Sequence, residues 1–208
     1  MPSYTVNPNE RNVLFPVFFK LHELELLIVG GGYVGWEKLQ AVLRNSPDAR
    51  VTLVAEELRN PEILKLAEAH PHVQVIERAF KKKDLKGKDL VILATDNPKL
   101  HKKIKKKAKK RHLLTNVADT PQLCDFYLSS VVQKGNLKVA ISTNGKSPTL
   151  AKRLRENLED VLPDEIDSLL DRLQEIRNQL KGDFEAKVEA LDNITADFMV
   201  KKDKAPKQ

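Results

Sequence analysis

Short apolar segments alternate with helical patterns between Glu25 and Val117. Residues 25–29 form an apolar run that ends on glycine, which is typical of a parallel strand buried on both faces. Apolar residues then recur at helical spacing from Val34 to Leu43. Further strands are predicted at 51–55, 73–76, 89–94 and 113–117, and helices at 62–69 and 99–111. This alternation predicts a parallel, doubly wound sheet of the Rossmann type, with its ligand at the carboxyl ends of the strands.

The pattern changes on both sides of this region. Residues 14–19 are apolar but contain Pro16, so they predict an edge strand or an extended lead-in. Two β-like runs, 126–132 and 137–142, surround a glycine-containing turn and predict a hairpin. Beyond them, Ser147 and Pro148 suit the start of a helix. Helices are predicted at 150–162, 164–180 and 184–199.

The fold class is therefore predicted to be α/β, with a Rossmann-type sheet, a β-hairpin dimerisation region and a small helical C-terminal domain. A length of 208 residues suits one α/β domain plus a smaller unit. We expect a homodimer, because a two-stranded hairpin alone is marginally stable in water. The predicted segments are a dinucleotide-binding domain at 1–119, the dimerisation region at 120–146, the helical domain at 147–200 and a disordered tail at 201–208.

A glycine-rich turn follows the first predicted strand directly. Gly30, Gly32 and Gly35 have the G-x-G-x-x-G spacing, between a strand and a helix. In such a turn Gly30 permits the tight bend, Gly32 lets the backbone approach a pyrophosphate, and Gly35 allows close packing of helix on strand. Free N–H groups at the helix start would hold the phosphates. The alternative is a glycine-rich turn without a ligand.

The second strand is followed by two acidic residues, Glu56 and Glu57. An acidic residue at this place usually binds the ribose hydroxyls, and Glu56 is the better candidate, while Glu57 is as readily explained as solvent-exposed. No basic residue occupies either position, which favours NAD over NADP, although Arg59 lies close by. Thr95 and Asp96 follow the fourth strand, at the same predicted ligand edge.

Composition indicates a soluble protein. The chain is 41% hydrophobic and 31% charged, and it has no run of about 18 apolar residues that could span a bilayer. It begins without the features of a secretory signal, and Cys124 is its single cysteine, so we expect a cytoplasmic protein. The five histidines are scattered, and no spacing predicts a metal site.

The net charge of +7 is concentrated in two lysine clusters, at 81–88 and 99–111. Such clusters are commonly a solvated helix face, or they attract a polyanionic partner. Nucleic acid is not expected, because the chain has no recognised binding motif and only 5% aromatic residues.

Five short motifs follow one another along the chain. They are Gly30-Gly31-Gly32-x-Val34, Ala94-Thr95-Asp96-Asn97-Pro98, Asn116-Val117-Ala118-Asp119, Cys124-Asp125-Phe126 and Ile141-Ser142-Thr143-Asn144-Gly145-Lys146-Ser147-Pro148. Together they resemble the sirohaem synthase family, namely its precorrin-2 dehydrogenase and ferrochelatase module without the methyltransferase domain, and the resemblance extends from Leu14 to about Leu180. It implies NAD-dependent oxidation of precorrin-2 to sirohydrochlorin, with insertion of ferrous iron in the bifunctional members.

The resemblance also implies roles for particular residues. Tyr33 and Val34 would bind the cofactor beside Glu56 and Glu57, and Asp119 would be the general base. Tyr33 departs from an acidic residue that is frequent in the family, but backbone contacts there should preserve binding. The other interpretation of Asp119 is a turn or cap residue before Thr120-Pro121.

The loop before the predicted helix at 150–162 is the candidate substrate site. Precorrin-2 carries eight carboxylates, which Lys146 at the helix start could contact, and for which the lysine clusters could act as an electrostatic funnel. Asn144 replaces a common glycine of this loop. The candidate substrate-binding residues are Ser142, Thr143, Lys146 and Ser147.

A different class of function is an NAD(H)-responsive redox-sensing binding protein that uses its lysine-rich face to hold a polyanionic partner. Such a sensor needs a recognition element, and the sequence offers none. It does not need a carboxylate at Asp119. The sequence therefore favours the enzyme.

Overall fold

The computed structural model describes residues 11–179, 188–189 and 191–192, in two compact units. The first contains the residues up to Ser130 together with Ile141–Ala151, and the second contains Val131–Ala140 and the residues from Lys152. The helix expected at 184–199 lies largely outside the described residues, and the tail at 201–208 lies wholly outside them.

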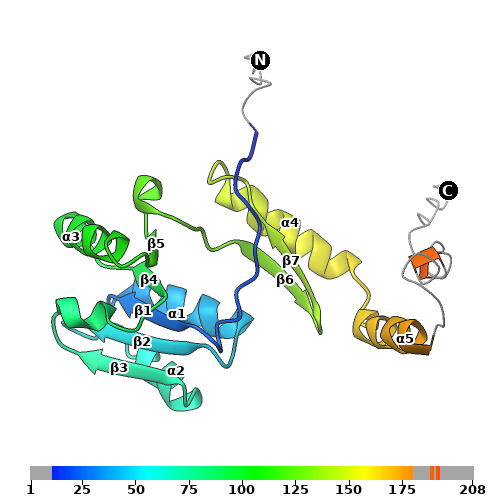
Figure 1. Ribbon diagram of the computed structural model, residues 1–208, viewed down its shortest axis with the longest axis horizontal. Coiled ribbons are helices and arrows are strands. Elements are labelled where there is room, and N and C mark those ends of the chain that lie inside the picture. The colour runs from blue at the N-terminus through cyan, green and yellow to red at the C-terminus, as the bar shows by residue number, and fades with distance from the viewer. Residues whose placement is uncertain (1–10, 180–187, 190, 193–208) are drawn as a thin grey trace, which may run out of the picture. The chain divides into compact units, whose positions relative to one another are not determined.

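The first unit is built on a parallel five-stranded sheet of order β3-β2-β1-β4-β5 (Figure 1). Every neighbouring pair is parallel, for example Ile28 of β1 beside Leu53 of β2 and Ile92 of β4. The reversal of strand order beside β1 is the switch point at which such sheets bind their ligands. The strands are β1 (Glu25–Val29), β2 (Arg50–Ala55), β3 (Val73–Glu77), β4 (Leu90–Leu93) and β5 (Leu114–Val117).

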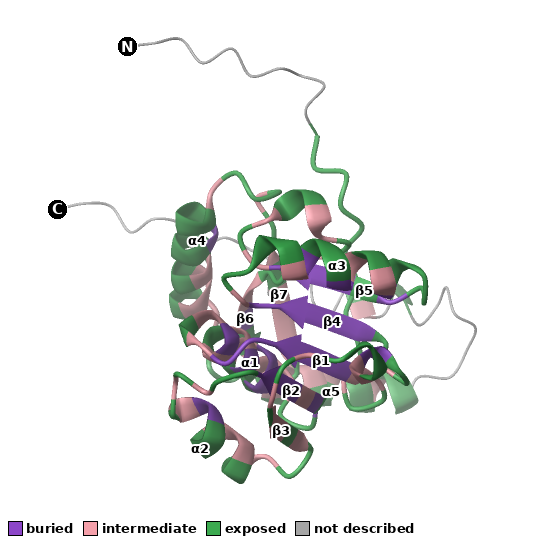
Figure 2. Cartoon of the chain, turned by 90° about the vertical axis from the view of Figure 1, so that its left-hand side faces the viewer, coloured by how far each residue is buried: buried purple, intermediate pink, exposed green. Residues whose placement is uncertain are grey.

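Helices cover both faces of this sheet. On one face α1 (Tyr33–Asn45) and α2 (Glu62–Ala69) pack against side chains such as Leu26 and Leu53. On the other face α3 (Pro98–Lys109) and the short helix η1 (Lys82–Leu85) pack against residues such as Leu27 and Val91. Figure 2 shows the resulting burial of β1 and β4, whose apolar runs are explained by cover on both faces.

For residues 14–19 the sequence left two alternatives, an edge strand and an extended lead-in, and the structure shows the extended lead-in. These residues form no strand, and Phe15 and Phe18 are strongly exposed. The hairpin also begins later than expected, at Ser130 rather than at residue 126. The reason is that Asp125 and Phe126 lie against β5 instead: the Asp125 N–H donates to the Thr115 carbonyl, and the Asn116 side chain donates to the Phe126 carbonyl.

The second unit contains most of a two-stranded sheet and the helices that follow. The sheet joins β6 (Ser130–Lys134) to β7 (Leu137–Ile141) through Gly135, whose φ of 53° suits a glycine turn. Two carboxylates fix this turn: Asp164 pairs with Lys134, and Asp167 accepts hydrogen bonds from the backbone and side chain of Asn136. The helices are α4 (Pro148–Val161), which begins in the first unit, and α5 (Ile166–Gln179).

Candidate cofactor and catalytic site

The turn between β1 and α1 has the shape that its glycines predict. Gly30 has a φ of 135°, and a side chain there would overlap the Ala94 carbonyl at the end of β4. A side chain on Gly35 would overlap the Gly30 carbonyl, so α1 packs directly on the turn. Gly32 faces open space, with no atom within 4 Å of the place where a Cβ would lie. The turn therefore leaves room above Gly32 for a ligand.

Gly31 has a structural role that sequence reasoning missed. A Cβ on this residue would lie 2.6 Å from the Ala55 Cβ and would overlap the Glu57 carbonyl. The Gly31 carbonyl accepts a hydrogen bond of 3.1 Å from the Asn60 N–H. The glycine turn and the loop after β2 are therefore held against each other, and the only signal in the sequence was an unbroken run of three glycines.

The first turn of α1 is an open helix start. Gly32 is its N-cap, no side chain caps it, and no acidic residue lies in its first turn. Free N–H groups and the helix dipole together favour a bound anion at such a place. Tyr33 is exposed and its ring lies 5.2 Å from that of Trp36, while Val34 is half-buried. Tyr33 thus directly follows the open position at Gly32, and its ring lies near that of Trp36 on the same helix.

The carboxylates after β2 differ in their availability. Glu57 accepts a hydrogen bond of 2.8 Å from the Arg59 Nε, and another Arg59 nitrogen lies 3.9 Å from Asp96. The hydrogen bond from Arg59 to Glu57, with the charge of Asp96, raises the pKa of Arg59. Glu56 is exposed and makes no such contact within the described chain. Of the two carboxylates, Glu56 is consequently the one without a partner among the described residues, and Arg59 joins the ends of β2 and β4 beside the turn.

Thr95 is positioned by a buried histidine that sequence reasoning did not single out. The His101 Nε2 lies 2.8 Å from the Thr95 hydroxyl, and that oxygen also accepts from the Asn97 N–H at 3.3 Å. Burial lowers the pKa of His101, although Asp96 and Thr95 act in the opposite direction. The His101 ring thus fixes the loop after β4, where Asp96 projects into solvent. No regular spacing marks His101 in the sequence.

Asp119 lies in a tight turn directly after β5. Its φ is 55°, and the Thr120 N–H donates to the Val117 carbonyl across the turn at 3.3 Å. The Cys124 sulfur accepts from the Val117 N–H at 3.2 Å and contacts the Val117 and Thr120 carbonyls. The thiol therefore holds the turn in place, while the Asp119 carboxylate is exposed at the ligand edge of the sheet.

A second set of contacts fastens the segment that carries Cys124. The Asp125 carboxylate pairs with Lys105 of α3 and accepts hydrogen bonds from the backbone and hydroxyl of the buried Thr115. Burial alone would raise the pKa of Asp125, but the hydrogen bonds from Lys105 and Thr115 outweigh it, so that the pKa is lowered. Asp125 is therefore an ionised anchor of this segment.

The loop expected to bind substrate is organised by its own hydroxyl groups. The Thr143 hydroxyl donates to the Ser147 carbonyl and accepts from the Ser147 N–H, each at 3.2 Å. The Ser147 hydroxyl accepts from the Leu150 N–H and so caps the helix. The Ser142 hydroxyl accepts from Asn12 and from the Asn144 N–H. Lys146 is exposed, and Asn144 has a φ of 53°, where glycine is common.

The site residues fall into two groups. The glycine turn, Glu57, Thr95 and Asp96 are linked through direct contacts at one edge of the sheet. In the described chain no hydrogen bond joins Ser142, Thr143 or Ser147 to Asp119 or to that turn. Among the described residues no group of His, Cys, Asp or Glu side chains could hold a metal ion. No helix in the described part of the chain is long and apolar enough to cross a bilayer.

Two family models match the chain. One, described as putative NAD(P)-binding, matches residues 17–130, and one described as sirohaem biosynthesis protein central matches residues 134–160. The first contains the glycine turn and Asp119, and the second contains the loop of Ser142 to Ser147. The expectation of a dinucleotide-binding Rossmann domain is thereby confirmed.

Individual proteins are similar over most of the chain. "Siroheme synthase" of Psychrobacter arcticus is 35% identical over 177 residues, which are 85% of this chain and 31% of the relative. "Siroheme synthase" of Psychromonas ingrahamii is 37% identical over 166 residues, 80% of this chain and 34% of the relative. The chain thus spans about a third of the length of these curated relatives.

One solved structure is similar in fold as well as in sequence. It is "SirC, precorrin-2 dehydrogenase", with a TM-score of 0.66 and 26% identity, and the match covers 87% of this chain and 89% of that one. The order of Rossmann sheet, hairpin and helices is thus confirmed as the fold class.

Proposed function

The chain belongs to the sirohaem synthase family, as its motifs predicted, and on that premise we propose that it is an NAD-dependent dehydrogenase that oxidises precorrin-2 to sirohydrochlorin. The observation that carries the proposal is the open glycine turn at the switch point of the sheet, with Asp119 at the same edge. A redox cofactor and a proton acceptor are the two groups that such an oxidation requires.

The residues present fit a dinucleotide. The N–H groups at the start of α1 would hold the pyrophosphate above Gly32, and Glu56 would accept hydrogen bonds from the ribose hydroxyls. Arg59 is engaged by Glu57 and Asp96, which reduces its availability for a 2′-phosphate and favours NAD over NADP. When bound, NAD supplies the acceptor for the hydride that leaves the tetrapyrrole.

Asp119 is proposed as the acceptor of the proton that leaves with the hydride. Its carboxylate is exposed directly after β5, at the edge where the nicotinamide end of a dinucleotide lies in this fold. Cys124 holds its turn from behind, which would fix the direction of the carboxylate. A substrate placed against this edge could therefore lose its proton to Asp119 in the same step as the hydride.

The substrate loop would supply positive charge and a rigid frame. Thr143 and Ser147 brace the loop, so they position the substrate through the backbone, and Lys146 is the side chain suited to meet a carboxylate. The carboxylates at the periphery of the tetrapyrrole would bind the Lys146 ammonium group, away from the ring that is oxidised.

The first experiment is anaerobic incubation of the protein with precorrin-2 and NAD while tetrapyrrole absorbance and NADH are recorded. We expect stoichiometric formation of sirohydrochlorin and NADH. A protein that binds NAD but leaves precorrin-2 unchanged would refute the proposed activity, whereas a protein that binds no NAD would refute the cofactor assignment as well.

Substitution of Asp119 tests the general base. Asp119→Asn should keep NAD affinity and fold, since asparagine tolerates a positive φ at least as well as aspartate. The rate at saturating NAD should fall by about 10²–10⁴-fold, the usual contribution of a general base. A near-normal rate with an unchanged melting temperature would refute the general-base role and leave Asp119 with a role in the turn alone.

Insertion of ferrous iron into sirohydrochlorin is proposed as a second reaction of the same edge. Metal insertion also requires the pyrrole N–H protons to leave, so one carboxylate could serve both steps. Anaerobic addition of ferrous iron to the protein with sirohydrochlorin should give sirohaem, and Asp119→Asn should slow it. No acceleration over the uncatalysed reaction would leave the dehydrogenase as the sole activity.

None of the similarities found above supports the redox-sensing alternative. The protein is proposed to be cytoplasmic, because a single cysteine that serves as a hydrogen-bonding group is suited to a reducing compartment. Cell fractionation would test this location.

A further inference from the structure

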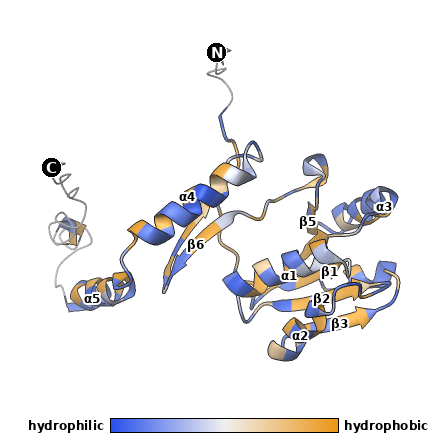
Figure 3. Ribbon diagram, turned by 180° about the vertical axis from the view of Figure 1, so that it is seen from behind, coloured by the Kyte–Doolittle hydropathy of each residue, from blue (hydrophilic) through white to orange (hydrophobic). Residues whose placement is uncertain are grey.

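Helix α3 carries a high positive charge that no acidic residue within the helix balances. It has no acidic residue, and lysines follow one another at i, i+3 and i+4 along its exposed sides. Like charges at these spacings repel and destabilise a helix. The helix dipole compensates only for the lysines of the last turn. In Figure 3 α3 is accordingly hydrophilic over most of its surface.

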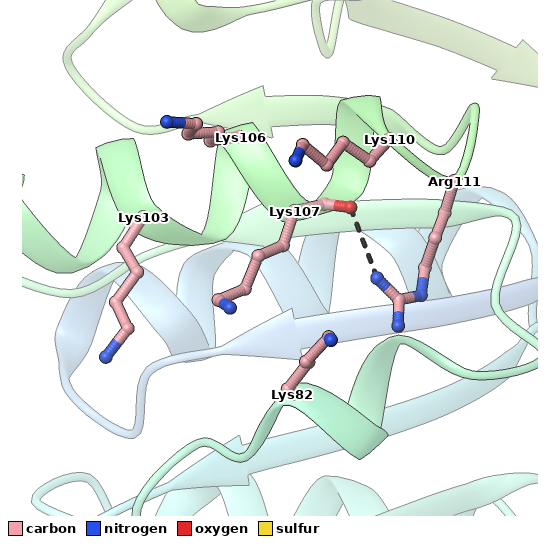
Figure 4. A pocket seen from close by; sticks show the side chains of 6 residues that line it. All are labelled: Lys82, Lys103, Lys106, Lys107, Lys110 and Arg111. Atoms are coloured by element: carbon pink, nitrogen blue, oxygen red, sulfur yellow. Dashed lines mark hydrogen bonds between the residues drawn. The ribbon is translucent and has the colours of Figure 1, made fainter.

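Part of this charge is gathered in a pocket of about 350 Å³. In Figure 4, Lys103, Lys107 and Arg111 point from the α3 region toward η1, and Lys82 extends from η1 toward them. Lys106 and Lys110 lie on the other side of α3 and complete the lining. Side chains from two separate elements thus direct cationic groups into one space.

Nothing in the described chain neutralises these six side chains. None of them makes an ion pair with a described acidic residue. The nearest acid in sequence to Lys82 is Asp84, and both of its oxygens are taken by Arg78, at 2.7 and 2.8 Å. Lys105 and Lys88, by contrast, are paired with acids. The charge of the pocket is consequently open to an external anion.

The pocket is separate from the cofactor site. Helix α3 leaves the ligand edge of the sheet after β4 and returns to the opposite edge before β5, so Lys107 and Arg111 lie toward that opposite edge. The helix η1 precedes β4 and lies near the same edge. The cations of this pocket therefore lie away from the glycine turn, and the electrostatic funnel for precorrin-2 carboxylates, which the sequence suggested for the lysine clusters, stays a prediction.

We propose that this pocket binds a compact oligophosphate, a small molecule with several closely spaced phosphate groups. The four cationic side chains that point into this space are not ion-paired, and together they match the charge density of such a ligand. The lining contains no aromatic ring on which a base could stack and no side-chain acceptor that could bind a base or sugar. Lysine ammonium groups bind phosphate as point charges, and the planar fork of Arg111 can bind a phosphate through two hydrogen bonds.

Binding of inorganic tripolyphosphate tests the proposal. Calorimetry at constant ionic strength, with NAD at saturation to occupy the glycine turn, compares tripolyphosphate with orthophosphate, citrate and a single-stranded oligonucleotide. We expect tripolyphosphate to bind most tightly. The variant Lys82→Gln/Lys103→Gln/Lys107→Gln should weaken its binding by about tenfold or more, because each side chain directs a charge into the pocket.

The matched control is Lys86→Gln/Lys102→Gln/Lys109→Gln, which removes the same charge from exposed positions outside the pocket. It should change the affinity by less than about threefold. Equal losses in both variants would mean a diffuse field and no site. Tighter binding of citrate or of the oligonucleotide would overturn the assignment to oligophosphate. If the triple variant does not fold, the tripolyphosphate affinities of the single variants Lys103→Gln, in the pocket, and Lys102→Gln, outside it, are compared instead.

Discussion

At the scale of single residues, the glycine turn shows which parts of the site the sequence could predict. Gly30 and Gly35 have the roles that their spacing indicates, because the positive φ of Gly30 and the close approach of Gly35 to the Gly30 carbonyl both arise within the turn. His101 and Cys124 could not be recognised in the same way. Their roles come from partners such as Thr95 and Val117, which only the folded chain brings to them.

The open space at Gly32 makes it a clean position for a test of cofactor binding. Gly32→Asp should fold normally, since no atom lies within 4 Å of the new Cβ and the φ of −89° suits any residue. Its carboxylate would repel the pyrophosphate, so calorimetry should detect no NAD binding. Gln40→Glu, which adds the same charge on the exposed side of α1, should bind NAD like the parent. Unchanged affinity in Gly32→Asp would move the cofactor away from this turn.

The pair of Arg78 and Asp84 predicts a pH dependence of stability. Hydrogen bonds from Arg78, helped by the Lys81 N–H, lower the pKa of Asp84 although burial opposes this. A carboxylate with a depressed pKa stabilises the fold above its unfolded pKa of about 3.9, and this contribution is lost as the pH falls through the folded value. Asp84→Asn should therefore cost about 1.5–3 kcal/mol at pH 7, a typical value for hydrogen bonds to a charged group.

Urea unfolding at pH 7 and pH 3 checks this prediction. The difference between Asp84→Asn and the parent should narrow at the lower pH, because the parent carboxylate is then increasingly protonated. Asp48→Asn, at an exposed turn before β2, should match the parent at both pH values. A difference that stays constant with pH would mean that packing and not charge explains the effect.

At the scale of elements, the sheet and its helices were largely predictable, but the segments between them were not. The strands at 25–29 and 89–94 were placed within a residue of β1 and β4, because burial on both faces gives a short apolar run. Residues 14–19 and 126–129 have equally apolar runs and form no strand. An apolar run forms a strand only if a partner edge is available, and no local pattern records that.

The turn of the hairpin offers a prediction at this scale. The Asp167 carboxylate at the start of α5 accepts two hydrogen bonds from Asn136 and lies where a side chain on Gly135 would be. Asp167→Ala should destabilise β6 and β7 locally by about 1 kcal/mol, with faster amide exchange in both strands. Asp167→Asn retains an acceptor oxygen and should exchange more slowly than the alanine variant. Identical exchange in both variants would show that the turn holds without α5.

At the scale of the whole molecule, we predict a homodimer. The sheet of β6 and β7 has only two strands, with half-buried apolar residues such as Val131, Leu137 and Val139. A two-stranded sheet is marginal alone, and a second copy could cover these side chains. Sedimentation at micromolar concentration should give twice the mass of a 23.6 kDa chain. A mass near that of one chain would exclude the dimer.

The strand order also determines when each edge of the sheet becomes covered during synthesis. β1 is made first but occupies the centre, between β2 and β4. Its second edge can pair only after Leu93 has left the ribosome, which at about 5–20 residues per second is several seconds after Val29. The strand that carries the glycine turn is thus the one that waits longest for its second partner. The nascent chain is most open to chaperones, or to a neighbouring nascent chain, in that interval.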